Sequence, residues 1–132
     1  MAGPPGDGSD CVFVYGLLKR GFALNHHCAQ GTFIGDATVR GALYSLGEYP
    51  GMADGDGIVH GELYRFPDIA LALEVLDEIE EYDPQNPENN LYVRLVKQAV
   101  LEKNATTMPA WVYLYNRDVK GLPRIKSGNW PE

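Results

Sequence analysis

The chain has 132 residues, of which 45% are hydrophobic and 11% aromatic, and this is enough to bury the core of one domain. Its 18 acidic and 11 basic residues give a formal net charge of -7, which argues against a nucleic-acid backbone or an anionic membrane surface as the main partner. No apolar run approaches the ~20 residues of a membrane-spanning helix, and the N-terminal residues lack the basic and apolar regions of a secretory signal, so a cytoplasmic protein is expected.

The N-terminal part of the chain predicts a tail, a buried strand and a loop. Residues 1–10 are rich in Gly, Pro and Asp, which is typical of a disordered tail. Residues 11–15, CVFVY, form a short apolar run typical of a buried strand, and the run breaks at Gly16. The polar segment 17–30 predicts a loop with a short helix.

The next part of the chain predicts strands separated by turns. Residues 31–45 are strand-like in composition, whereas residues 47–57 are rich in turn residues and include two Asp-Gly pairs at 54–57. Residues 58–66 predict a further strand, in which Gly61 indicates a bulge or close packing.

Residues 68–82 read DIALALEVLDEIEEY and predict the one long helix. Asp68 is suited to cap its N-terminus, and Pro84 predicts that it ends by the preceding residue, since a residue before proline resists helical angles. A polar loop then leads to two more strands, over 92–101 and 110–115.

Consecutive strands joined by short turns, with one long helix inserted late, favour an α+β fold built on a mostly antiparallel sheet or small barrel. The sequence contains no repeated βαβ unit and no internal repeat. We expect a disordered tail over residues 1–10, one domain over residues 11–118, and a partly ordered C-terminal tail over residues 119–132.

Glu80 is predicted to be the only acidic residue of the helix that points inward. At about 100° per residue, Ile69, Leu73 and Leu76 share one face and Glu80 falls in the middle of it, whereas Asp77 falls on a flank. Burying an unpaired charge costs several kcal/mol, on the order of a large part of a domain's stability. Glu80 therefore either carries a function, pairs with a buried arginine or tyrosine, or escapes to solvent at the helix end.

Burial and the nearby helix C-terminus would both raise the pKa of the Glu80 carboxyl. A carboxyl with a raised pKa can exchange protons near neutral pH. Gly16 gives a second candidate, because a glycine at a strand end can bring backbone N–H groups close to a carboxylate or an oxyanion. A simple turn is the alternative explanation of Gly16.

Metal and thiol sites are only weakly indicated. His26 and His27 are adjacent, so their side chains are expected to diverge, and with His60 as the only other histidine no ligand spacing appears. No metal or cofactor is therefore expected. Cys11 and Cys28 are expected to be reduced, and a cysteine-dependent enzyme that uses Cys28 is a weaker alternative.

Six short motifs occur in order along the chain: VFVYGLLKRG (12–21), GEYPG (47–51), GELY (61–64), LDEIE (76–80), YVR (92–94) and WVY (111–113). Taken together, they resemble the ordered motifs of the gamma-glutamylcyclotransferase-like family. The resemblance implies a small, mostly antiparallel β-barrel flanked by one long and one or more short helices. The LDEIE segment resembles the helix end that carries the catalytic glutamate of that family, which implies that Glu80 is the general acid/base.

The resemblance also implies a reaction. The substrate is a γ-glutamyl amine or γ-glutamyl amino acid, whose own α-amino group attacks its γ-carbonyl to give 5-oxoproline and a free amine. The implied partner is thus a small molecule, with no cofactor, no nucleic acid and no membrane, and the oligomeric state stays open. The implied substrate-binding residues are Tyr15, Gly16, Leu17, Leu18, Tyr49 and Tyr113.

The chain departs from the family pattern at two positions. Leu17 stands where Ser or Thr is common, so a hydroxyl contact is lost while backbone contacts can survive. Glu81 stands where glycine is common, at the end of the predicted helix. These departures motivate an alternative function, a non-catalytic small-molecule-binding module of the same fold.

Overall fold

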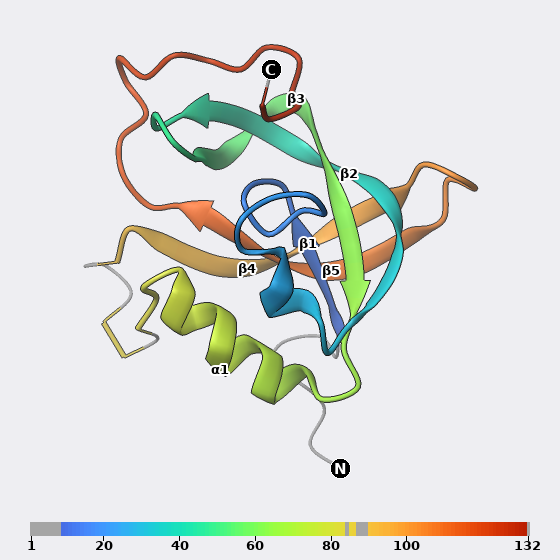
Figure 1. Ribbon diagram of the computed structural model, residues 1–132. Helices are drawn as coiled ribbons and strands as arrows, with labels where there is room; N and C mark the ends of the chain where they lie inside the picture. Colours follow the sequence, from blue (N-terminus) through green and yellow to red (C-terminus); the bar gives the residue numbers. More distant parts are fainter. Residues whose placement is uncertain (1–8, 84, 87–89, 132) are drawn as a thin grey trace.

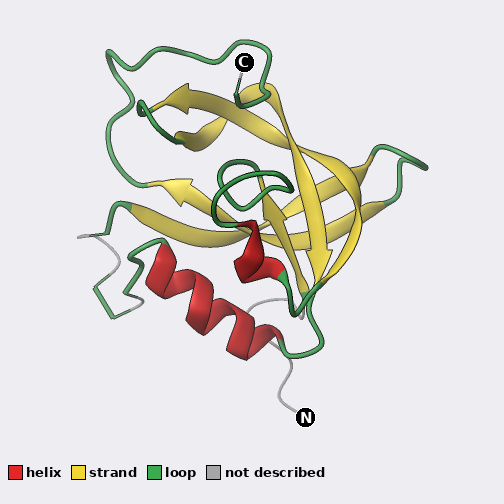
Figure 2. Cartoon of the chain, in the orientation of Figure 1, coloured by secondary structure: helices red, strands yellow, loops and turns green. Residues whose placement is uncertain are grey.

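Five strands close into a barrel in the order β1-β3-β2-β4-β5 (Figures 1 and 2). The structure is a computed structural model that describes residues 9–83, 85–86 and 90–131. Every pair of neighbouring strands is antiparallel except β1 and β5, which are parallel. The elements are β1 (Cys11–Val14), a 3₁₀ helix (Asn25–Cys28), β2 (Thr32–Ser45), β3 (Pro50–Arg65), α1 (Ile69–Ile79), β4 (Tyr92–Leu101) and β5 (Thr107–Tyr115). The predicted α+β fold, with a mostly antiparallel barrel, one long helix and one short helix, is confirmed.

The turn predicted at 54–57 is wrong, because these residues lie within β3. Arg40 pairs with Ile58 and Ala42 pairs with Ala53, so one residue of β2 stands opposite four residues of β3. The Asp-Gly pairs therefore form an exposed irregularity in a continuous strand instead of ending it.

Two layers of apolar side chains hold the helix on the barrel. Alternate residues of β1 point into the barrel or out toward α1, and all four are buried, which explains the unbroken apolar run. Figure 2 shows α1 lying against one side of the barrel. The predicted apolar face of the helix packs there, with Ile69, Leu73 and Leu76 all buried. At Gly61 an added Cβ would clash with the Val14 carbonyl oxygen, so the predicted close packing is confirmed.

The helix begins as predicted and ends earlier than predicted. The Asp68 carboxylate accepts a hydrogen bond from the Leu71 N–H at 3.1 Å and caps the N-terminus. The helix ends at Ile79, well before Pro84, because Glu81 adopts a left-handed backbone with φ of 55°. The Tyr82 N–H then donates to the Asp77 carbonyl at 2.8 Å, which closes the helix with a reverse turn.

The C-terminal segment lies across the end of the barrel formed by β2 and β3 (Figure 1). Its backbone is joined to these strands by three hydrogen bonds, which are Ser45 N–H to Pro123 carbonyl, Ile125 N–H to Leu43 carbonyl and His60 N–H to Gly128 carbonyl. Most of the predicted N-terminal tail and much of the predicted loop at 84–90 fall outside the described residues. Within the described part, no helix has the length and apolarity that crossing a membrane requires.

Replacing Glu81 with glycine is expected to stabilise the protein. An L-residue in the left-handed region costs about 1 kcal/mol relative to glycine, and Glu81 is exposed, so little packing is lost. Glu81→Gly should raise the free energy of unfolding in urea by roughly that amount. Glu81→Ala is the control, since it removes the charge and keeps the strained backbone. Equal stability of the two variants would show that backbone strain at position 81 has no effect.

Candidate active site

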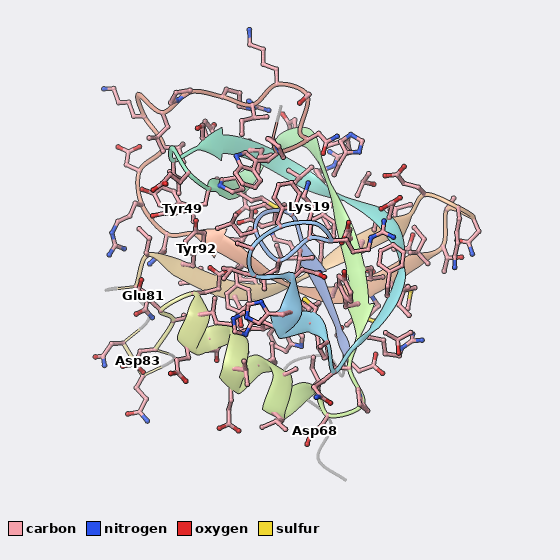
Figure 3. The ribbon with its side chains drawn as sticks, in the orientation of Figure 1. Lys19, Tyr49, Asp68, Glu81, Asp83 and Tyr92 are labelled. Carbon is pink, nitrogen blue, oxygen red and sulfur yellow. The ribbon has the colours of Figure 1, made fainter. Side chains whose placement is uncertain are left out.

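A cavity of about 240 Å³ lies where the end of β1, the C-terminal end of α1 and the start of β4 meet. It is lined by the loop that follows β1, by the connection between β2 and β3, and by residues of β4 and β5. Figure 3 shows Tyr49, Tyr92 and Glu81 on this side of the molecule. The structure brings together at this cavity all seven residues singled out from the sequence, Tyr15, Gly16, Leu17, Leu18, Tyr49, Glu80 and Tyr113.

Glu80 lies at the C-cap of α1, and its side chain lines the cavity. Among the residues that the structure describes, none donates a hydrogen bond to its carboxylate or forms an ion pair with it. Burial raises the pKa of Glu80 to about 7. A carboxyl with this pKa exists in both protonation states at neutral pH, so it can both accept and donate a proton.

The prediction that Glu80 alone points inward is wrong, because Asp77 points inward as well and is buried, whereas Glu80 is half-buried. The Asp77 carboxylate accepts two hydrogen bonds from Arg94, from Nε at 2.7 Å and Nη2 at 3.1 Å, and one from the Tyr113 hydroxyl at 2.6 Å. The Arg94 guanidinium also lies 5.0 Å from the centre of the Trp111 ring. The flank of α1 that carries Asp77 faces β4 and β5, so the buried arginine and tyrosine pair with Asp77 and leave Glu80 unpaired.

Three of the tyrosines that line the cavity donate their hydroxyls to protein acceptors. Tyr15 donates to the Tyr113 carbonyl at 2.6 Å, Tyr92 to the Pro50 carbonyl at 2.9 Å, and Tyr113 to Asp77. Burial raises the pKa of all three hydroxyls, with the Glu80 carboxylate adding to the effect, so they stay protonated. These side chains therefore form fixed walls of the cavity.

Tyr92 is a cavity residue that the sequence did not single out as a site residue, although it opens the YVR motif. Tyr49 differs from the other three, since its side chain is 38% exposed at the mouth of the cavity. It is the lining tyrosine with the most freedom to meet a ligand.

Residues 16–18 line the cavity, and their backbone groups differ in whether they have a protein partner. Their carbonyls are engaged within the protein, by the Lys19 N–H (to Gly16, 3.1 Å), the Leu24 N–H (to Leu17, 3.0 Å) and the Asn25 amide (to Leu18, 2.8 Å). In a trans peptide the C=O and the following N–H point in opposite directions. The N–H groups of Leu17 and Leu18 therefore point away from these contacts, and within the described part of the chain they donate to no protein acceptor. Such groups can hold a carboxylate or a developing oxyanion.

The histidines and cysteines lie apart from this chemistry. The His26 and His27 rings do not diverge as expected, because their centres are 4.0 Å apart. Among the described residues, no three His, Cys, Asp or Glu side chains gather as a metal site would require. Cys11 and Cys28 are both unpaired and buried, and burial raises the pKa of each thiol to about 11. A neutral buried thiol argues against Cys28 as a nucleophile.

Comparisons of the sequence with a family model and with known proteins agree on one family. The model of the family described as gamma-glutamyl cyclotransferase, AIG2-like, matches residues 12–132. The gamma-glutamylcyclotransferase family protein YtfP of Escherichia coli K12 is 36% identical over 120 residues, which cover 90% of this chain and 94% of that protein. A putative gamma-glutamylcyclotransferase of Vibrio cholerae is 31% identical over 123 residues, with 90% and 93% covered.

Solved structures show the same fold. The solution structure of YtfP from Escherichia coli superposes with a TM-score of 0.60 at 34% identity, covering 92% of this chain and 96% of that one. The crystal structure of an AIG2-like protein from Mus musculus superposes with a TM-score of 0.70 at 23% identity, covering 89% and 86%. The second similarity bears on the fold alone.

Breaking the buried ion pair is expected to destabilise the protein strongly. Both side chains are shielded, at 14% exposure for Arg94 and 12% for Asp77, so Asp77→Asn would leave a buried guanidinium without its counter-charge. The free energy of unfolding should fall by about 3 kcal/mol or more. Asp54→Asn is the control, because Asp54 is 78% exposed in its pair with Lys97, and should cost under about 1 kcal/mol. Similar losses in the two variants would contradict the special importance of the buried pair.

Proposed function

The chain belongs to the gamma-glutamyl cyclotransferase, AIG2-like family, and from this we propose that it is an enzyme that cyclises γ-glutamyl amines. One observation carries the proposal. An unpaired carboxyl whose pKa is raised to about 7, Glu80, shares a cavity with two free backbone N–H groups, those of Leu17 and Leu18. A proton acceptor and an anion-binding site are the two features that this reaction requires.

The proposed reaction is an acyl transfer within one substrate molecule. The α-nitrogen forms a bond to the γ-carbonyl carbon, and the bond between that carbon and the amine nitrogen breaks. The proton lost by the α-nitrogen passes to the Glu80 carboxylate, which then protonates the departing amine. The products are 5-oxoproline and the free amine, so atoms and charge balance. Because the attack is intramolecular, effective molarity can supply several kcal/mol, up to roughly 7–11 in well-oriented cases.

The protein groups have distinct roles in this proposal. The N–H groups of Leu17 and Leu18 hold the substrate α-carboxylate or the oxyanion, and this contact needs no hydroxyl at position 17. Tyr15, Tyr92 and Tyr113 hold the walls in place, since their hydroxyls are already engaged. Protein walls around a site strengthen the electrostatic contacts within it, because they lower the local dielectric constant.

A groove beside the cavity is the proposed place of the departing amine. A more open groove of about 510 Å³ shares Tyr49 and Leu91 with the cavity, and its other walls include Leu46, Tyr115 and Leu122. None of the described residues that line it is charged. We therefore place the amine portion in this groove, where an apolar amine is better accommodated than an amino acid whose carboxylate would have no counter-charge.

A free small molecule as substrate and a cytoplasmic setting are part of the same proposal. A cavity of about 240 Å³ is of a size for a glutamyl group, and the net charge of -7 argues against nucleic acid and anionic membranes. The unpaired cysteines, Cys11 and Cys28, suit a reducing compartment.

A non-catalytic binding module is the second candidate, and Leu17 is the residue that favours it. Its side chain lines the cavity where a hydroxyl is common in the family, so one substrate contact is missing. Thermal stabilisation of the protein by γ-glutamyl compounds without release of 5-oxoproline would favour this candidate over catalysis.

Glu80→Gln is expected to reduce the release of 5-oxoproline at least 100-fold, because general acid–base catalysis contributes roughly 10²–10⁴-fold. The assay is a panel of γ-glutamyl amines and γ-glutamyl amino acids, in which apolar amines should be the better substrates. Glu78→Gln is the matched control, since Glu78 is an exposed carboxylate of the same helix. Full activity of Glu80→Gln would remove Glu80 from the mechanism, and no 5-oxoproline from any substrate would remove the proposed reaction.

The pH dependence of kcat/KM should report the raised pKa of Glu80. The carboxylate must be ionised to accept a proton, and burial moves its ionisation from near 4.5 to about 7. Activity should therefore rise with pH up to about 7 and fall about tenfold for each pH unit below it. A profile that stays flat down to pH 5 would show that no group with this pKa limits the reaction.

A further inference from the structure

A further buried carboxylate, Glu62, lies behind the loop that follows β1. It lies on β3, paired with Val14 of β1 on one side and Asp36 of β2 on the other, and its side chain is buried. Glu62 is not among the residues that line the cavity. A buried carboxylate that cannot reach the substrate calls for a separate explanation.

Glu62 accepts three hydrogen bonds, two of which come from the loop. The Arg20 backbone N–H donates to Oε1 at 2.9 Å, and the Arg20 Nε donates to Oε2 at 3.3 Å. The Tyr64 hydroxyl also donates to Oε1, at 3.1 Å. Hydrogen bonds to an ionised acceptor are stronger than neutral ones, so Glu62 fixes the main chain at Arg20, two residues after Leu18.

The same network reaches Leu18 through Asn25. The Asn25 amide donates to the Leu18 carbonyl at 2.8 Å and to the Tyr64 hydroxyl at 3.1 Å, and that hydroxyl in turn donates to Glu62. The loop is thus held at Leu18 and at Arg20 by one connected set of side chains.

We propose that Glu62 is a positioning residue, which acts through the loop to keep the backbone N–H groups of Leu17 and Leu18 directed into the cavity. Lys19, between the two anchored residues, donates its N–H to the Gly16 carbonyl, and the N–H of Leu17 points the opposite way from that carbonyl. Holding residues 18 and 20 therefore sets the direction of the donors. The proposal rests on the proposed function, because it gives these donors a substrate carboxylate or oxyanion to bind.

The test measures binding apart from chemistry. An N-butyl glutaramate keeps the carboxylate and the γ-amide of the substrate but lacks the α-amino group, so it cannot cyclise. Isothermal titration of the full chain with this compound should show Kd at least fivefold higher for Glu62→Gln and at least tenfold higher for Glu62→Ala. With a γ-glutamyl amine, KM should rise more than kcat falls, since donors that hold the α-carboxylate bind it alike in the ground state and the transition state.

Asp36→Asn is the matched control. Asp36 is the other carboxylate near the Arg20 guanidinium, at 3.6 Å and 59% exposed. Among the described residues, the Arg20 N–H donates to Glu62 and not to Asp36. The Kd of the Asp36→Asn variant for the compound should therefore stay within twofold of that of the parent protein. If Asp36→Asn weakens binding as much as Glu62→Gln, charge near Arg20 is responsible and the positioning of the loop is not.

Equal binding of the compound by the parent protein and a folded Glu62→Gln variant would overturn the proposal. Should the Glu62 variants fail to fold, Asn25→Ala removes the Leu18 anchor and tests the same network. Its Kd for the compound should be at least fivefold higher than that of the parent protein, and an equal Kd would again overturn the proposal. If the parent protein releases 5-oxoproline and the Glu62 and Asn25 variants bind the compound normally, the loop anchors have no positioning role. The proposed function is not contradicted by that result. A parent that neither releases 5-oxoproline nor binds the glutaramate overturns the proposed function as well.

Discussion

Asp77 and Arg94 form the one ion pair, among the described residues, in which both side chains are largely shielded from water. The pair joins the last turns of α1 to β4, and the Tyr113 hydroxyl extends it to β5. Removing either partner would leave a buried charge, so the helix is held in one position on the barrel. The next residue along the helix that faces inward, Glu80, is placed at the cavity as a consequence.

The same pair explains the electrostatics of the site. Arg94 comes close to this end of the helix, and its guanidinium is occupied by Asp77. Glu80 is therefore half-buried without a counter-charge, and its burial raises its pKa to about 7. The backbone N–H groups of Leu17 and Leu18 are therefore the candidates to bind a negatively charged group of a ligand. Asp77, which is paired, thus holds the helix on the barrel, whereas Glu80, three residues later and unpaired, lines the cavity and can exchange protons.

Local features of this fold could be predicted from the sequence, and long-range pairings could not. The cap at Asp68, the apolar face of α1 and the place of Glu80 on it follow from the helical period. The partners of Asp77 come 17 and 36 positions later, and Glu62 lies 42 positions after Arg20, so no local pattern could indicate them. The turn predicted at 54–57 failed for a related reason, since a barrel strand absorbed the Asp-Gly pairs as an irregularity set by its pairing with β2. The ordered motifs indicated the cavity residues because they come from a family resemblance, which carries tertiary information.

The proposed mechanism depends on Glu80, an unpaired carboxyl in the cavity whose pKa is raised by burial to about 7. The most direct measurement is an NMR titration of the glutamate side-chain carboxyl carbons, with the Glu80 signal assigned by its loss in Glu80→Gln. Glu80 should titrate with a midpoint of about 7, because its burial disfavours the charged form. A midpoint near 4.5 for Glu80 would contradict the account, because the carboxyl would then be solvated or paired.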